Sequence, residues 1–324
     1  MAKKKKKVAV KGPDSVGTKQ RPVHTEILVR PIHRGVNDIG SWRSALRLAD
    51  LGNRTKLYDL FTDLLIDGYL SDAIDKRIDA VTDADLAFTI DGKQVDEMDA
   101  LMDTPEFESL LREIMLSRFW GVSLVECLFL DGFGFKSIPR KHIRTKTKEI
   151  AIREEDEHGI PYADNDLIIQ FGSDDDFGIL LRAAPFVIYK RGGFGDWAQF
   201  VELFGMPQRI GKYSSMDEQS RRALIQAFEE AGSAPYLVIP KETEATQTTL
   251  SSSGNGALYN DFRNACNEEI LITVLGQTMT TQDGSSLAQG QVHMAVQEKK
   301  HRADRRFVER MLNKYFVPLL EKRG

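Results

Sequence analysis

Residues 190–213 read KRGGFGDWAQFVELFGMPQRIGKY, and residues 268–282 read EEILITVLGQTMTTQ. In each stretch apolar residues recur at helical spacing, stop at a glycine and give way to a polar run. We therefore expect two helices with a small αβ insert between them. Neither stretch carries a recognisable catalytic constellation, so the pair indicates a structural hairpin, such as a wall element of an assembly, rather than an enzyme pocket.

The bulk composition is that of an ordinary soluble protein. The chain has 324 residues, of which 41% are hydrophobic and 28% charged, which is enough to bury a sizeable core and to form two or three domains. No apolar run approaches the roughly 18 residues of a membrane span, so we expect no membrane association. Cys127 and Cys266 lie inside apolar patterns and are expected to be buried free thiols.

Charge is unevenly distributed along the chain. Residues 1–21 hold eight Lys or Arg and one acid, Asp14, which gives +7, whereas the whole chain carries −4. We expect residues 1–29 to form a disordered basic tail, either simply solvated or in contact with nucleic acid or an acidic partner. The remaining −11 argues against a protein that grips DNA by neutralising its phosphates.

Residues 30–178 predict an α+β domain, with helices first and a small antiparallel sheet after them. The expected helices are a short one around Trp42, one over 57–65 that ends at Gly68, one over 70–81, one at 98–102 and one that starts at Pro105. The expected strands lie at 87–90, 122–130, 133–138, 143, 150–152 and 167–171, where β-rich runs are separated by polar turns.

The second half follows another pattern. A helix is expected over 180–205, with Pro185 in its first turn and a kink or break at Gly192, Gly193 and Gly195, since each interior glycine costs about 1 kcal/mol relative to alanine. The elements expected after it are a strand at 208–213, a helix at 215–232 capped by Ser215, strands at 236–239 and 246–250, a flexible joint at 251–256, a helix at 257–275, a polar segment at 277–290 and a basic helix at 292–322.

Candidate catalytic and metal sites are weak. Acidic runs at 154–157 and 174–176 lack the spaced ligand pattern of an EF-hand and are expected to be solvated turns. His293 and His301 are about 12 Å apart along one helix and cannot share a metal ion. As a strand, residues 140–144 would place Arg140, His142 and Arg144 on one face, either as a partner-facing edge or as a charged edge that discourages aggregation. No nucleotide-binding or hydrolase motif occurs, so we expect no enzyme, cofactor or metal.

Short segments, taken in order over residues 28–316, resemble the portal proteins of Mu-like tailed bacteriophages. Four of them are IPRKHIR at 138–144, IYKR at 188–191, GDWA at 195–198 and LGQTMTT at 275–281. Others are RPI at 30–32, IGSWR at 39–43, LYDL at 57–60, DKR at 75–77, WG at 120–121 with Glu126, FGMP at 204–207, RIGKY at 209–213 and CNE at 266–268. Each is weak by itself, and their common order makes the resemblance specific.

The resemblance implies an α+β portal fold built of a wing, two stem helices, an αβ clip and a helical crown. Carried over by position, the wing would be 30–179, the stem helices 180–206 and 257–276, the clip 207–256, the tunnel loop 277–290 and the C-terminal wing or crown helix 291–324. Little sequence follows Pro318, so the crown is expected to be shortened.

The resemblance also implies a role. Such proteins form a ring, here a homododecamer, at one capsid vertex of the virion, assembled in the host cytoplasm as the conduit for packaging and ejecting double-stranded DNA. The implied partners are the terminase large subunit, the major capsid protein or scaffold, and head-completion or adaptor proteins. DNA would pass through the channel non-specifically.

Three groups of residues are the site candidates under this resemblance. The tunnel loop would use the neutral hydrogen-bonding side chains of Gln277, Thr278, Thr280, Thr281, Gln282, Ser285 and Ser286. Lys190 and Arg191 would either line the channel or pair with Asp196 or Glu202. The clip interface would use Arg209, Lys212, Tyr213 and Tyr236.

Two other functions remain open from the residues alone. One is a metal-dependent DNA-processing enzyme that uses the acidic runs at 154–157 and 174–176. The other is a ring-forming adaptor without a portal role.

Overall fold

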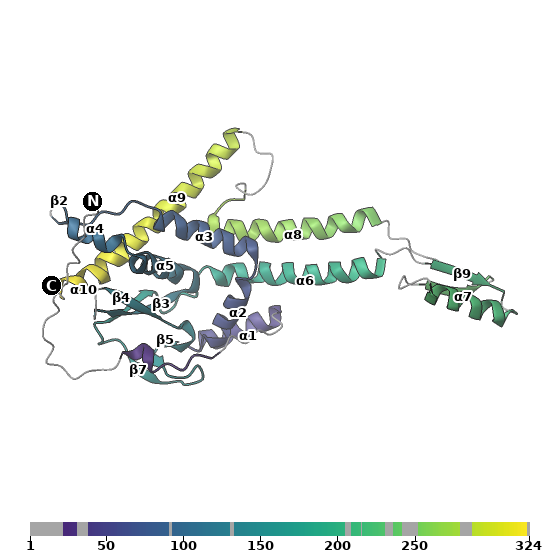
Figure 1. The fold of residues 1–324 in the computed structure, drawn as a ribbon, viewed down its shortest axis with the longest axis horizontal. Helices are drawn as coiled ribbons and strands as arrows, with labels where there is room; N and C mark the ends of the chain where they lie inside the picture. Colours follow the sequence, from purple (N-terminus) through teal and green to yellow (C-terminus); the bar gives the residue numbers. More distant parts are fainter. Residues whose placement is uncertain are drawn as a thin grey trace, which may run out of the picture. The chain divides into compact units, whose positions relative to one another are not determined.

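The computed structural model describes residues 22–30, 38–90, 93–129, 133–204, 209–214, 216–230, 236–241, 252–278 and 287–322. The chain forms two compact units (Figure 1). The larger unit contains Met1–Ile188 and Glu268–Gly324, and the smaller unit contains Tyr189–Asn267. Two long helices, α6 (Leu180–Phe204) and α8 (Ser252–Leu275), contribute residues to both units.

Several helices of the larger unit begin at side-chain caps. After the short η1 (Val23–Thr25) come α1 (Ile39–Asp50), α2 (Thr55–Leu64), α3 (Gly68–Thr82), α4 (Asp96–Met102) and α5 (Pro105–Trp120). The expectation that Gly68 ends a helix is wrong, because the Asp67 carboxylate accepts the N–H of Leu70 at 3.1 Å and makes Gly68 the first residue of α3. Pro105 begins α5 as predicted, with Thr104 as its cap.

The strands of the larger unit form small antiparallel sheets, as the α+β prediction requires. The main sheet has the order β4 (Gly134–Ile138), β3 (Val122–Leu128), β8 (Ile168–Gly172), with Leu124 opposite both Ile138 and Gln170. A second sheet joins β5 (Ile143–Arg144), β6 (Glu149–Ala151) and β7 (Gly159–Pro161), and a hairpin joins β1 (Thr89–Ile90) to β2 (Lys93–Gln94). Gly121, at φ +88°, lets the chain turn from α5 into β3.

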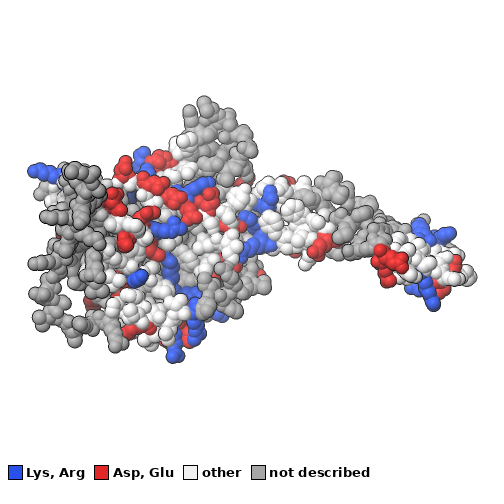
Figure 2. Space-filling model, in the orientation of Figure 1, with Lys and Arg blue, Asp and Glu red and all other residues white. Residues whose placement is uncertain are grey.

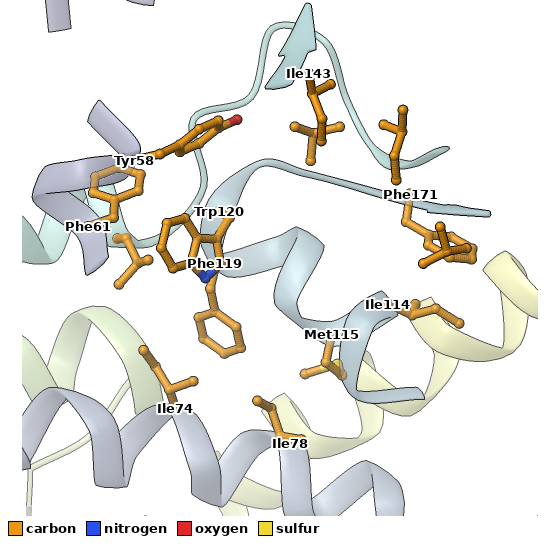
Figure 3. Packing of buried hydrophobic residues seen from close by; sticks show 14 of the residues in the cluster. Tyr58, Phe61, Ile74, Ile78, Ile114, Met115, Phe119, Trp120, Ile143 and Phe171 are labelled. Carbon is orange, nitrogen blue, oxygen red and sulfur yellow. The ribbon is translucent and has the colours of Figure 1, made fainter. Parts of the chain in front are cut away.

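One core lies between the helices and the main sheet. The rings of Tyr58, Phe61 and Trp120 meet with centroids 5.7–6.3 Å apart, and Figure 3 shows Phe119 pointing toward Ile74 and Ile78 of α3. Burying one such side chain stabilises the fold by about 1.5–3 kcal/mol. Cys127 and Cys266 are buried free thiols, as predicted, and burial raises the pKa of Cys127 to about 12.

The C-terminal helices belong to the same core. The helix α9 (Leu287–Met311) continues through a π-helical turn (Leu312–Phe316) into α10 (Val317–Glu321). The ring of Phe316 lies 5.9 Å from that of Phe107 and 5.0 Å from that of Phe133. The predicted helix at 292–322 is therefore confirmed, apart from its start and the π turn within it.

Residues 140–144 do not form the charged edge strand that alternation predicts. Arg140–His142 form a 3-10 turn, and only Ile143–Arg144 pair in a sheet. His142 is fully buried, with Nδ1 2.9 Å from the carbonyl oxygen of Ala151. Arg144 donates to the backbone carbonyl oxygens of Lys141, Glu154 and Asp156. These side chains hold local loops together, because buried polar groups need partners.

The helix α6 runs unbroken from Leu180 to Phe204, so the predicted break at its glycines is wrong. A Cβ at Gly193 would lie 2.9 Å from the Phe262 ring of α8, whereas Gly192 and Gly195 face open space. Stacking of Trp197 on Tyr259, at 6.4 Å and 9° between planes, holds the two helices together. Tertiary packing of this kind outweighs the intrinsic cost of the glycines. Pro185 is inside the helix, beyond the first turn.

The smaller unit also holds a strand–helix–strand motif. The parallel strands β9 (Arg209–Tyr213) and β10 (Tyr236–Pro240) flank α7 (Glu218–Glu230), and the Phe228 ring packs close to Gly211. These elements were predicted, and at the start of α7 the Asp217 carboxylate accepts the N–H of Ser220. The prediction of a flexible joint at 251–256 is wrong for the described residues of that segment, since Ser252–Gly256 are helical. The strand expected at 246–250 and the cap residue Ser215 lie outside the described residues.

Candidate functional site

The polar segment that follows α8 is anchored where it leaves the helix. Gly276 adopts φ +79° and ends α8, and its N–H donates to the carbonyl oxygens of Leu271 and Ile272. Gln277 is buried, and its Nε2 donates to Oε1 of Gln297 on α9 at 3.1 Å. Thr278 is half-buried. The other predicted loop residues, Thr280, Thr281, Gln282, Ser285 and Ser286, lie outside the described residues, and 287–290, expected in the loop, belong to α9.

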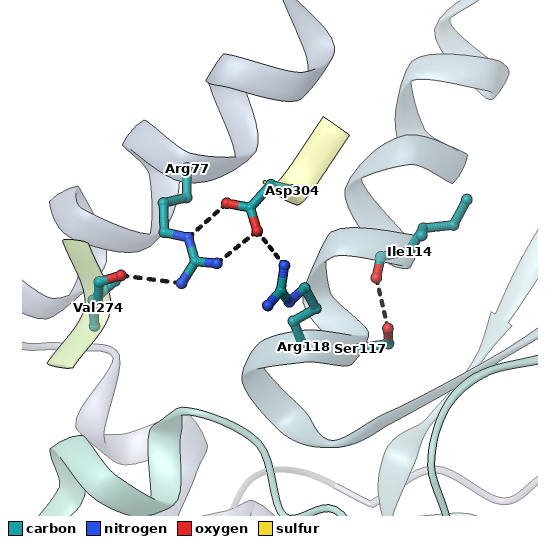
Figure 4. A network of polar contacts seen from close by, with 6 residues as sticks. All are labelled: Arg77, Ile114, Ser117, Arg118, Val274 and Asp304. Carbon is teal, nitrogen blue, oxygen red and sulfur yellow. Dashed lines mark hydrogen bonds and ion pairs between the residues drawn. The ribbon is translucent and has the colours of Figure 1, made fainter. Parts of the chain in front are cut away.

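A buried ion pair joins the helices at this base. Arg77 of α3 donates from Nε to Asp304 Oδ2 at 2.8 Å and from Nη2 to Asp304 Oδ1 at 2.6 Å (Figure 4). Its Nη1 donates to the carbonyl oxygen of Val274, in the last turn of α8, at 3.0 Å. Both charged side chains are at most 1% exposed. One guanidinium therefore connects α3, α8 and α9 next to the point where the polar segment begins.

Two further cations surround Asp304. Arg118 of α5 donates to Asp304 Oδ1 at 2.5 Å, and its guanidinium carbon lies 5.1 Å from the ring centroid of Phe307. Lys300 lies one turn before Asp304 on α9 and packs beside Gly276. Burial, followed by the positive charge of Arg77, lowers the pKa of Lys300 to about 8, against the opposing pull of Asp304. The site thus gathers cations around a single buried carboxylate.

The sequence held a signal for this cluster that the motif search missed. Arg77 falls on the buried stripe of α3, between Ile74, Ile78 and Val81. Asp304 falls on the buried stripe of α9, one turn before Val308. Charges at buried positions require partners, so opposite charges on two apolar faces would have predicted that these helices pair.

The acidic runs serve local structure. Asp174 binds Lys148, with Oδ1 2.7 Å and Oδ2 2.6 Å from Nζ, and accepts a hydrogen bond from Gln170. Although burial opposes it, these contacts hold the pKa of Asp174 below its usual range. Asp176 Oδ1 accepts the N–H of Gly178, and Glu155 pairs with Arg30 at 2.8 Å. Within the described ranges no cluster of three His, Cys, Asp or Glu side chains could hold a metal ion.

The comparison with known families decides the class of this protein. The profile of the family described as portal protein of Mu bacteriophage matches residues 58–324, most of the chain. The chain belongs to this portal protein family. The match includes α3, α5, α6, α8 and α9, and so all the residues of the Arg77–Asp304 cluster.

Two curated relatives agree with this assignment. The portal protein of Escherichia phage Mu is 29% identical over 140 residues, which is 42% of this chain and 27% of that protein. The Mu-like prophage FluMu protein gp29 of Haemophilus influenzae is 29% identical over 124 residues, which is 37% of this chain and 24% of that protein. The alignments thus span about a quarter of the length of these relatives.

The remaining predicted residues of this portal-family chain lie in the smaller unit. Lys190 is buried, at 8% exposure, and Arg191 is half-buried; their position in a channel stays a prediction. Among the clip candidates, Arg209 of β9 lies opposite Tyr236 of β10 in the strand register. Lys212 is exposed and Tyr213 half-buried, and both line a shallow hollow with Asp217 and Lys241. In the part of the chain that the structure describes, no helix is long and apolar enough to cross a bilayer.

Proposed function

We propose that this chain assembles into a portal ring, a homododecamer at one vertex of a phage capsid, through which double-stranded DNA is packaged and ejected. The observation that carries the proposal is the family match over residues 58–324. A closed ring uses one heterologous interface repeated head to tail. The product would be a virion component, assembled in the host cytoplasm.

The paired helices of the smaller unit suit the stem of such a ring. Their surfaces expose large apolar side chains, including Phe194 at 43%, Val201 at 51% and Leu258 at 67%. Exposed apolar groups on neighbouring turns favour burial against another protein, here the next copy of the chain. We assign 180–206 and 257–276 to the stem, 207–256 to the clip, 30–179 to the wing, and the C-terminal helix 291–324 to the wing or the crown.

The segment at 277–286, which precedes α9, is the tunnel-loop candidate. It begins at the buried Gln277, beside the Arg77–Asp304 pair, so its base is rigid on the side of α8. Its polar residues are mostly neutral, which lets them touch a DNA backbone without the tight phosphate neutralisation that would stop sliding. Figure 2 shows acidic and basic side chains interspersed over one face of the described larger unit, which is also compatible with weak, non-specific contact.

The partners in this account follow from the portal role. The terminase large subunit would dock on the ring and supply ATP hydrolysis, since the sequence contains no nucleotide-binding motif and we assign the chain no catalytic activity. The major capsid protein or scaffold would contact the wing, and head-completion or adaptor proteins would bind the clip.

Removing the loop tests the proposed conduit role. We expect deletion of residues 279–284, which spares the Gln277 anchor, to leave rings assembled but to yield particles that fail to package or retain DNA. Packaged DNA per particle, measured by quantitative PCR after nuclease treatment, is the readout. Normal packaging, or loss of the ring itself, would contradict the loop assignment.

A further inference from the structure

A hollow of about 610 Å³ on the larger unit gathers basic side chains from four helices. Five of them line it: Arg77 of α3, Arg118 of α5, Arg182 of α6, and Lys300 and Arg310 of α9. Among the acids, Asp176 lines the hollow and Asp304 lies behind Arg77 and Arg118. Basic groups therefore clearly outnumber carboxylates.

The basic groups form layers from floor to rim. Arg77 is buried at the floor, Arg118 and Lys300 are half-buried on the walls, and Arg182 and Arg310 are exposed at the rim. Asp304 is already shared between Arg77 and Arg118. Across the described residues, Arg182, Lys300 and Arg310 form no ion pair with any acid. Positive charge is thus left uncompensated at the walls and the rim.

Neutral donors complete the lining. Ser173 and Thr273 contribute hydroxyl groups, and Gly178 and Ile179 lie at the start of α6. The N-terminal end of a long helix carries a partial positive charge, which favours an anion nearby. Burial, followed by the positive charge of Arg77, lowers the pKa of Lys300. The contribution of Arg77 agrees with the excess of basic groups over acids in the hollow.

We propose that this hollow binds a phosphate-class oxyanion. Guanidinium groups present forked N–H donors that match phosphate oxygens in pairs, and the hydroxyl groups can satisfy the remaining oxygen atoms. The group comes either from free phosphate or from a nucleic-acid backbone. The proposal does not depend on ring assembly or on DNA transport.

Calorimetric titration tests the site directly. Sodium phosphate is titrated into the full chain at pH 7, against chloride at equal ionic strength. We expect saturable binding that weakens at least about tenfold in Arg182→Gln/Arg310→Gln, because the variant loses charge-assisted hydrogen bonds to the anion. The matched control is Arg222→Gln/Arg306→Gln, which removes the same charge from exposed positions outside the hollow and should bind like the wild type.

A second variant, at Lys300 on the wall of the hollow, separates a loss of phosphate binding from a loss of folding. Lys300→Gln should also weaken phosphate binding, and it should flatten the loss of affinity that the wild type shows between pH 7 and 9.5. Thermal melts followed by circular dichroism establish that each variant is folded. If the rim variant does not fold, the Lys300→Gln titration decides alone.

A DNA competition identifies the source of the phosphate group. The phosphate titration is repeated in the presence of a short DNA duplex. If the duplex weakens phosphate binding to the wild type but does not change the titration of the rim variant, the nucleic-acid backbone is the source. If the duplex leaves the wild-type titration unchanged, the source is the free anion. Both results keep the phosphate site. An absence of saturable heat in the wild type, or equal affinity in the rim variant and its control, would overturn the proposal.

Discussion

Arg77 and Asp304, 227 residues apart in the sequence, form a two-point ion pair with both side chains at most 1% exposed. The pair connects α3 to α9, and the third bond of Arg77 reaches the last turn of α8. A buried charge that loses its partner pays the desolvation cost without compensation. This contact therefore stabilises the base from which the polar segment at 277–286 leaves the core.

Removing the carboxylate should destabilise the larger unit strongly. We expect Asp304→Asn to lower the free energy of unfolding by about 3–5 kcal/mol, because Arg77 and Arg118 then lack their carboxylate partner. Urea denaturation followed by tryptophan fluorescence provides the measurement. Asp72→Asn, which removes a carboxylate from the exposed pair with Lys76, should change the free energy of unfolding by less than about 1 kcal/mol. Equal effects of the two changes would refute the role of the buried pair.

The glycines of α6 offer a matched pair of substitutions. Gly192→Ala should raise stability by about 0.5–1 kcal/mol, since the position is helical and open and alanine is the better helix former. Gly193→Ala should gain nothing or lose stability, because its Cβ would lie 2.9 Å from the Phe262 ring. Thermal melts of the full chain separate the two, and identical shifts would argue against the close approach of α6 and α8.

The segment Val23–His24 should be released when its acceptor is removed. The buried Glu126 accepts the N–H of Val23 at 2.7 Å and that of His24 at 2.9 Å, and lies 2.6 Å from His24 Nδ1. We expect Glu126→Ala to speed hydrogen exchange of these amides at least about tenfold, as charge-assisted bonds contribute about 1.5–3 kcal/mol. Exchange mass spectrometry of the peptide that holds them is the assay. Glu155→Ala, the exposed partner of Arg30, should leave their exchange unchanged.

Lys300 should make stability rise with pH. Its folded pKa of about 8 lies below its ordinary 10.5, so between these values the unfolded chain binds more protons and stability increases as pH rises. Lys300→Met should remove this increase and raise stability at pH 7. Urea denaturation at pH 7 and 9.5, in chloride buffer, tests both effects. Lys299→Met, at the exposed neighbouring position, should keep the wild-type slope.

Local sequence patterns predicted much of this fold, because the residues at the ends of helices and strands determine where those elements start and stop. Pro105 started α5 and Gly276 ended α8 as expected, and the strand–helix–strand order of the smaller unit followed from period changes. Contacts between distant residues explain the failures. Phe262 and Tyr259 of α8 keep α6 intact across its glycines, and backbone carbonyl oxygens bind Arg144 in place of an edge strand. The Asp67 cap at the start of α3 was a local signal in the sequence. The prediction missed it because it placed the end of the preceding helix at Gly68.

The candidate site was predictable only in part. Motif reasoning found Gln277 and the strands that bring Arg209 opposite Tyr236, because polar runs and turns are visible in the sequence. It missed Arg118 and Lys300, whose roles depend on helices that meet only in the folded chain.

The central claim is that this chain is the subunit of a portal ring, and native mass spectrometry of the purified full chain, with negative-stain images of the same sample, tests it most directly. We predict one sharp species at the mass of a dodecamer, seen as a ring with a central channel. A chain that stays monomeric at every concentration, or that forms open assemblies without a channel, would contradict the account.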